Sequence, residues 1–102
     1  MKCLTLILHQ AAKDDIIERL LDEESVRGFT ILSGEGHSRR TQSNPFETNH
    51  DRVMGYVPRV RVDVVLEASA VEPLLDKLRH CDSCVTGLGV WWITPVEASG
   101  YL

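Results

Sequence analysis

The sequence predicts an α+β sandwich of the ferredoxin-like βαββαβ type, in which two helices cover one face of a four-stranded sheet. Three observations predict it. The chain has 102 residues, which suits one domain with one core. Four segments show the apolar alternation of strands, and two others show the apolar spacing of helices. Because the order is strand, helix, strand, strand, helix, strand, we expect a single domain over residues 1–102.

The first three elements follow from apolar periodicity. Cys3–His9 alternates with apolar side chains on both faces, which predicts a strand covered on both sides. Asp15–Glu18 has the pattern of a capping box, and apolar residues at helical spacing then predict a helix that runs to Ser25. Val26–Leu32 is rich in β-branched and aromatic residues and predicts the second strand, which should run out at Ser33–Gly36.

The same periodicities predict the three elements of the second half of the chain. Arg59–Glu67 alternates valines with mostly charged residues and predicts the third strand. Ser69–Glu72 forms a second capping-box pattern with Pro73 in the first turn, so a second helix should begin there and end near His80. Val85–Thr94 predicts the fourth strand, interrupted early by two glycines.

A polar segment, residues 37–58, separates the second and third strands and predicts a long loop. Loops beyond about 12–15 residues are uncommon in compact domains and are usually functional or disordered. The alternative is a frayed hairpin with no role. We regard this segment as the strongest pointer to function inside the chain.

The sheet face opposite the helices also carries apolar side chains. Thr5, Ile7 and Val65 lie on it, together with one residue of the pair Trp91 and Trp92, which point to opposite faces of one strand. A lone domain of this size rarely leaves so much apolar surface in contact with water. We therefore expect an oligomer whose sheets face inward.

The charge balance argues against two classes of partner. Eleven Lys and Arg against fifteen Asp and Glu give a net charge of -4, whereas nucleic acids and anionic membranes require basic surfaces. The apolar runs are too short for a membrane span and the first residues do not lead into a signal peptide, so we expect a cytoplasmic protein. Recognisable catalytic motifs are absent from the sequence, and we expect no enzyme activity.

Several short motifs together resemble one family. They are Asp14–Asp15, Val26–Thr30, Gly36 with Arg39, Pro58–Val62, Gly87–Gly89 and Pro95–Glu97. In order, spacing and loop position, they resemble the PII nitrogen-regulatory superfamily over nearly the whole chain. The ending Ile93–Leu102, together with Gly28–Thr30, is most similar to a PII-like branch associated with heavy-metal efflux systems.

The resemblance implies a homotrimer whose loops, here residues 37–58, grip a protein partner, commonly a membrane transporter. It also implies a small effector, often an adenine nucleotide, bound between neighbouring subunits. Glycine turns would let backbone N–H groups approach phosphate, and two arginines would neutralise it. By position, the family's nucleotide contacts fall on Gly28, Thr30, Gly36, His37, Ser38, Arg39, Arg59, Gly87 and Gly89.

The chain departs from the family pattern at positions that bind phosphate. An acidic and a basic residue of the glycine-rich turn are replaced by Leu88 and Val90, and two C-terminal arginines would fall beyond Leu102. We therefore expect weak nucleotide binding or a different effector. The tyrosine that some relatives uridylylate would fall near Arg52, and Tyr56 lies too close to the third strand to replace it.

A C-x-x-C pair at the end of the second helix has three interpretations. Cys81 and Cys84, with His80, could be half of a transition-metal site that His37, His50 or another subunit completes. They could instead form a reversible disulfide. They could also be ordinary turn cysteines. The alternatives to the regulatory reading are thus a metal sensor and a thiol redox sensor.

Overall fold

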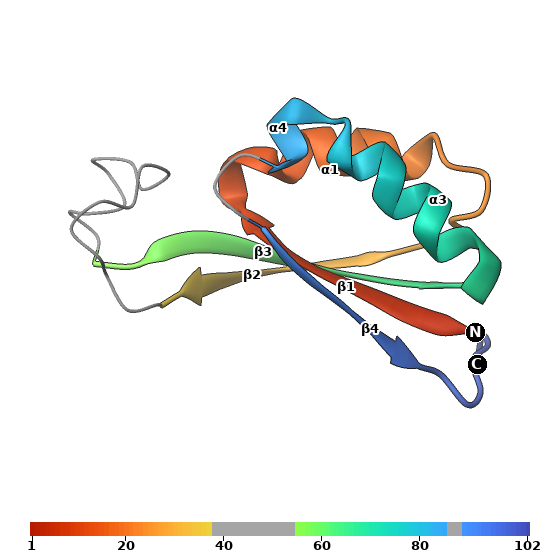
Figure 1. Cartoon of the computed structure of the whole chain (residues 1–102). Coiled ribbons are helices and arrows are strands. Elements are labelled where there is room, and N and C mark those ends of the chain that lie inside the picture. Colours follow the sequence, from red (N-terminus) through yellow and green to blue (C-terminus); the bar gives the residue numbers. More distant parts are fainter. Residues whose placement is uncertain (38–54, 86–88) are drawn as a thin grey trace.

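The computed structural model describes residues 1–37, 55–85 and 89–102 (Figure 1). In chain order the elements are β1 (Lys2–His9), the 3₁₀ helix η1 (Gln10–Ala12), α1 (Lys13–Leu21), β2 (Thr30–Gly36), β3 (Val57–Leu66), α3 (Ala68–Arg79), α4 (Asp82–Val85) and β4 (Val90–Pro95). Within these ranges, no helix is both long and apolar enough to cross a membrane.

The strands of the described residues form one antiparallel sheet in the order β2-β3-β1-β4. The helices α1, α3 and α4 all lie on one face of this sheet, and the other face is left open (Figure 1). Both chain ends lie at the same end of the sheet, away from the connection between β2 and β3. This arrangement confirms the expected ferredoxin-like α+β sandwich.

The core lies between the helices and the sheet, and alternation in the two central strands builds its floor. Apart from Lys2 and Pro58 near the strand ends, the even-numbered residues of β1 and β3 are buried on the helix side. One apolar stripe from each of the two longer helices covers them. The strand and helix residues of this core are Leu4, Leu6, Leu8, Val60, Val62, Val64, Leu66, Ile16, Leu20, Val71, Leu74, Leu75 and Leu78.

The first helix begins earlier than its sequence pattern indicates. Asp15 lies inside α1, whose N-cap is Ala12 without a side-chain hydrogen bond, so the predicted capping box is wrong. The side-chain cap instead lies on the preceding 3₁₀ helix η1. Its N-cap residue is His9, whose Nδ1 accepts a hydrogen bond of 3.0 Å from the Ala11 N–H. The helix ends at Leu21 rather than at Ser25.

The second helix also begins earlier than its sequence pattern indicates. Glu67 is the N-cap of α3 and makes no side-chain capping bond, so Ser69 lies inside the helix and the second predicted capping box is also wrong. Pro73 lies in the helix body rather than in the first turn. The predicted end near His80 is confirmed, since His80 is the C-cap residue.

Pairing between strands moves the remaining boundaries. β2 starts at Thr30 rather than Val26 and continues through the glycine-containing residues 33–36, because these pair with residues 57–60 of β3. β3 begins at Val57, so the predicted loop 37–58 ends earlier than expected, and its residues 38–54 lie outside the described residues. Val85 belongs to α4 and not to the fourth strand.

Candidate functional site

The strand register brings several predicted effector residues to one end of the sheet, which we call the loop end and define by Gly36, His37, Arg59 and Gly89. Arg59 pairs with Gly34 on one side and with His9 on the other. Gly89 directly precedes β4 and lies against the same end of β1. The chain leaves β2 for residues 38–54 from this end.

Both described glycines of the loop end are in close contact with neighbouring strands. A Cβ atom on Gly36 would lie 2.7 Å from Arg59 Cγ and 3.2 Å from the Val57 carbonyl oxygen. A Cβ atom on Gly89 would lie 2.6 Å from Leu8 Cδ2. A side chain at Gly36 would therefore displace Arg59, which links this glycine directly to the position of the guanidinium.

His37 is exposed beside the same strand end. Its Nε2 lies 3.1 Å from Glu35 Oε1, and its ring centroid lies 6.0 Å from that of Tyr56. The three side chains form a small polar cluster next to Gly36. Tyr56 directly precedes β3, as the sequence indicated.

The loop end is divided between the two edges of the sheet. Gly36 belongs to β2 and Gly89 to the start of β4, and these are the two edge strands. Three interstrand spacings, about 14 Å in total, separate the two edge strands. A compact ligand therefore meets one glycine or the other within a single copy of the chain.

The other predicted effector residues do not join this group. Thr30 lies six residues before Gly36 on an extended strand, which corresponds to about 20 Å. Gly28 and Thr30 instead line a hollow near the chain ends, with Arg27, Glu67 and Tyr101 among the other residues around it. Ser38, Arg39 and Gly87 lie outside the described residues.

The open face of the sheet carries a polar network that the sequence patterns did not reveal. Thr5 Oγ1 donates a 2.7 Å hydrogen bond to Asp63, and Arg61 Nε donates a 3.0 Å hydrogen bond to the same carboxylate. The guanidinium carbon of Arg61 lies 5.7 Å from the ring of Trp92. The available signal was the spacing of Arg61 and Asp63 on one strand face, with Thr5 on the neighbouring strand.

The network controls the ionisation of Asp63. Partial burial acts to raise the pKa of Asp63, but the hydrogen bonds from Arg61 and Thr5 more than offset it, so this pKa is lowered from its usual value. Thr5 is only 1% exposed, so its hydroxyl depends on Asp63. The carboxylate form is thus part of the folded structure of the open face.

Trp91 and Trp92 point to opposite sheet faces, as expected. Trp91 shares a register position with Leu6 on the helix side, and Trp92 pairs with Thr5 on the open side. One tryptophan of the pair was expected in the helix-covered core, but Trp91, on the helix side, remains 44% exposed. The cause is that β4 is an edge strand, and the guanidinium of Arg79 lies 5.8 Å from the Trp91 ring at its border with solvent.

The two cysteines of the C-x-x-C pair are joined by a disulfide, and both are buried. Of the three interpretations, the structure therefore contains the disulfide. His80 Nδ1 donates to the Asp76 carbonyl oxygen at 2.7 Å. Among the residues that the structure describes, no three His, Cys, Asp or Glu side chains are grouped as a metal site would require, so Cys81, Cys84, His80 and His37 are not assembled into one.

The sheet order, the helix layer and the open face define a protein of the ferredoxin-like α+β class. The family described as "Protein of unknown function (DUF3240)" matches residues 1–102, and the chain belongs to this family. The expected resemblance to the PII superfamily is confirmed by the comparisons that follow.

Two nitrogen regulatory proteins P-II are similar in sequence. The protein of Azospirillum brasilense is 27% identical over 86 residues, which cover 83% of this chain and 77% of the relative. The protein of Mesorhizobium japonicum is 27% identical over 67 residues, which cover 66% of this chain and 60% of the relative.

Two solved structures share the fold. A DUF3240 family protein from Shewanella baltica is 25% identical with a TM-score of 0.76, covering 99% of this chain and 94% of that one. CPII, a nitrogen regulatory PII-like protein from Thiomonas intermedia, is 20% identical with a TM-score of 0.68 over the same shares. The CPII structure was solved with ADP, AMP and bicarbonate bound.

Proposed function

We propose that this chain is a PII-like regulatory protein that binds a small effector between subunits and signals to a protein partner through residues 37–58. The observation that carries the proposal is the placement of Gly36 with Arg59 at one sheet edge and Gly89 at the other. The similarity to P-II proteins and to the nucleotide-bound CPII supports an adenine nucleotide as the effector.

The assembly would be a homotrimer built on the open sheet face. This face presents Ile7, Leu32, Val65, Val90 and Trp92 as partly or largely exposed apolar residues. Burial of such a surface stabilises association, since apolar area removed from water contributes about 25 cal/mol per Å². Cyclic closure would bring the β2 edge of one subunit beside the β4 edge of the next.

This geometry would complete the effector site. Gly36 and Arg59 of one subunit would face Gly89 of its neighbour, so a phosphate would meet backbone N–H groups and a guanidinium together. Because Leu88 and Val90 replace the charged residues of the family pattern, we expect weak nucleotide affinity. The protein partner would be a membrane transporter, and the chain itself would have no catalytic role.

Isothermal titration of the protein with ADP and AMP tests the effector site. Gly36→Ala should weaken nucleotide binding about tenfold, because a displaced Arg59 loses a charge-assisted hydrogen bond. Gly34→Ala is the matched control in the same strand, since a Cβ there meets nothing within 4 Å. Equal affinity in both variants would contradict the assignment, and a monomeric mass in solution would contradict the shared site.

Thiol redox sensing is the second candidate function, and the Cys81–Cys84 disulfide supports it. A dithiol reductant would transfer two electrons and two protons to the pair, giving two thiols and the oxidised reductant. The reduced pair would also be the form able to bind a transition metal. Titration of free thiols before and after dithiothreitol tests the switch, and zinc uptake by the reduced protein, compared with Cys84→Ser, tests the metal alternative.

A further inference from the structure

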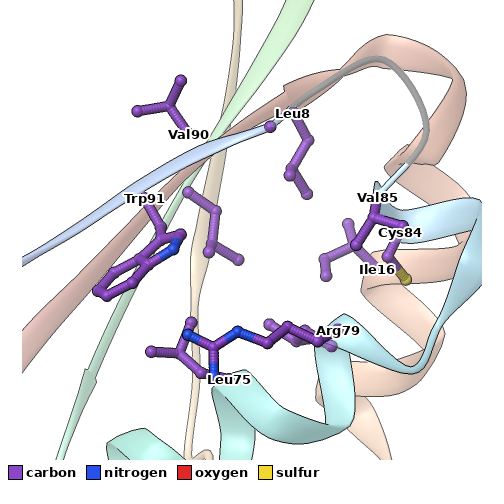
Figure 2. Close-up of a pocket in the computed structure, with 11 residues that line it drawn as sticks. Leu8, Ile16, Leu75, Arg79, Cys84, Val85, Val90 and Trp91 are labelled. Carbon is purple, nitrogen blue, oxygen red and sulfur yellow. The ribbon is translucent and has the colours of Figure 1, made fainter.

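A second hollow lies on the helix side of the sheet, between α3, α4 and the start of β4 (Figure 2). Leu8 and Trp91 enter it from the sheet, whereas Ile16, Leu75 and Val85 enter it from the helices. Its volume is about 240 Å³. Gly89 of the loop end also lines it. The hollow lies on the same side of the sheet as the helices, whereas the open face is on the other side.

The hollow has a buried apolar floor and an exposed apolar rim. Ile16 and Leu75 belong to the core, while Val85 is 46% exposed and Trp91 is 44% exposed beside them. Large apolar side chains that remain exposed around a concave surface are typical of a ligand site. A hydrocarbon group placed here would cover the floor and the rim at once.

Arg79 gives this apolar site a polar end. It carries the one formal charge among the described residues that line the hollow. Its guanidinium lies over the Trp91 ring, and its Nη1 is 4.0 Å from Glu72 Oε2, too far for a direct hydrogen bond. Glu72 is well exposed and does not line the hollow. The guanidinium therefore keeps its donors for an anionic group at the mouth.

We propose that this hollow binds a small amphipathic carboxylate. The hydrocarbon part would contact Ile16, Leu75 and Val85, and the carboxylate would pair with Arg79 beside Trp91. An apolar cavity of about 150 Å³ holds a molecule the size of benzene, so this volume suits about ten non-hydrogen atoms. The site goes beyond the proposed function, because it adds a second effector class in a hollow on the helix side of the sheet.

Titration calorimetry of the oxidised protein with octanoate, and in parallel with 1-octanol, tests the proposal. Octanoate should bind, and Arg79→Met should weaken it about tenfold while leaving octanol affinity unchanged, because only the carboxylate loses a charge-assisted contact. Arg19→Met is the matched control, since Arg19 also lies in the last turn of a helix but does not line the hollow. It should bind octanoate as the unmodified chain does.

A second variant tests the apolar part independently of the charge. Val85→Phe enlarges a rim side chain that is already half-exposed, so folding is not at risk, and it should weaken octanoate and octanol to the same extent. Failure of octanoate to bind at millimolar concentration would overturn the proposal. An equal loss of octanoate binding in Arg79→Met and Arg19→Met would also overturn it.

Discussion

The two faces of the sheet differ in chemistry although the same strands build both. Towards the helices, β1 and β3 present an unbroken layer of Leu and Val. On the open face the same strands place a hydrogen-bonded group, Thr5, Asp63 and Arg61, among apolar side chains. Apolar contacts tolerate many arrangements, whereas a polar group removed from water requires its partner in one geometry. The helix face therefore supplies stability, and the open face holds three polar side chains in one geometry.

The largest effect should come from a cavity in the helix-side core. Ile16 is fully buried, so Ile16→Ala should lower the free energy of unfolding by about 3 kcal/mol. Leu21→Ala on the same helix is the control, because Leu21 is largely exposed and should change stability little. Urea denaturation measures both. Similar losses in the two variants would remove the distinction between core and surface on α1.

On the open face, loss of a hydrogen-bond partner should matter more than loss of volume. Asp63→Ala leaves the buried Thr5 hydroxyl with only its weak 3.9 Å contact to Cys3 Sγ, and we expect a loss of about 2 kcal/mol in the free energy of unfolding. Thr5→Val removes the hydroxyl itself. The double variant should therefore be less destabilised than the sum of the two single variants, whereas strict additivity would show that Thr5 and Asp63 are not coupled.

The Asp63 carboxylate should also make the stability of the fold depend on pH in the acidic range. Because the pKa of Asp63 is lowered in the folded protein, its contribution is complete above the unfolded pKa near 3.8 and is lost as pH falls through the lower folded value. The difference in Tm between the unmodified chain and Asp63→Asn should shrink as pH falls from 5 to about 2. A Tm difference that stays constant over this pH range would contradict the ionised, hydrogen-bonded state of Asp63.

The smallest effect should come from a partly exposed ion pair between α3 and the turn that follows α1. Lys77 Nζ lies 2.7 Å and 2.8 Å from the two carboxylate oxygens of Glu23. Lys77→Met should reduce the free energy of unfolding by about 0.5 kcal/mol, since exposed ion pairs contribute little, and high salt should remove part of that difference. If Lys77→Met lowered the free energy of unfolding as much as Ile16→Ala, the pair would be a major contribution to the packing of α3 against the turn after α1.

The family resemblance assigned the candidate site residues by position, but their contacts could not be predicted. Gly36 and Gly89 were expected to let backbone N–H groups approach a phosphate, and the structure shows that Arg59 and Leu8 occupy the space that a Cβ atom at these positions would need. The spacing of Cys81 and Cys84 permitted several roles, and spatial proximity selected the disulfide. The Asp63 network joins residues 58 positions apart in the chain, which no local pattern encodes.

Local spacing was enough to indicate the order of the elements, the core face of each central strand and the apolar character of the second face, because side-chain direction repeats every 2 or about 3.6 residues. Strand ends depended on the folded chain instead. Residues 33–36 joined β2 because β3 lies beside them, and Trp91 stayed exposed because β4 is an edge strand. The extent of a strand and the exposure of its side chains depend on which distant segments of the chain pack together. Only the tertiary structure determines that packing.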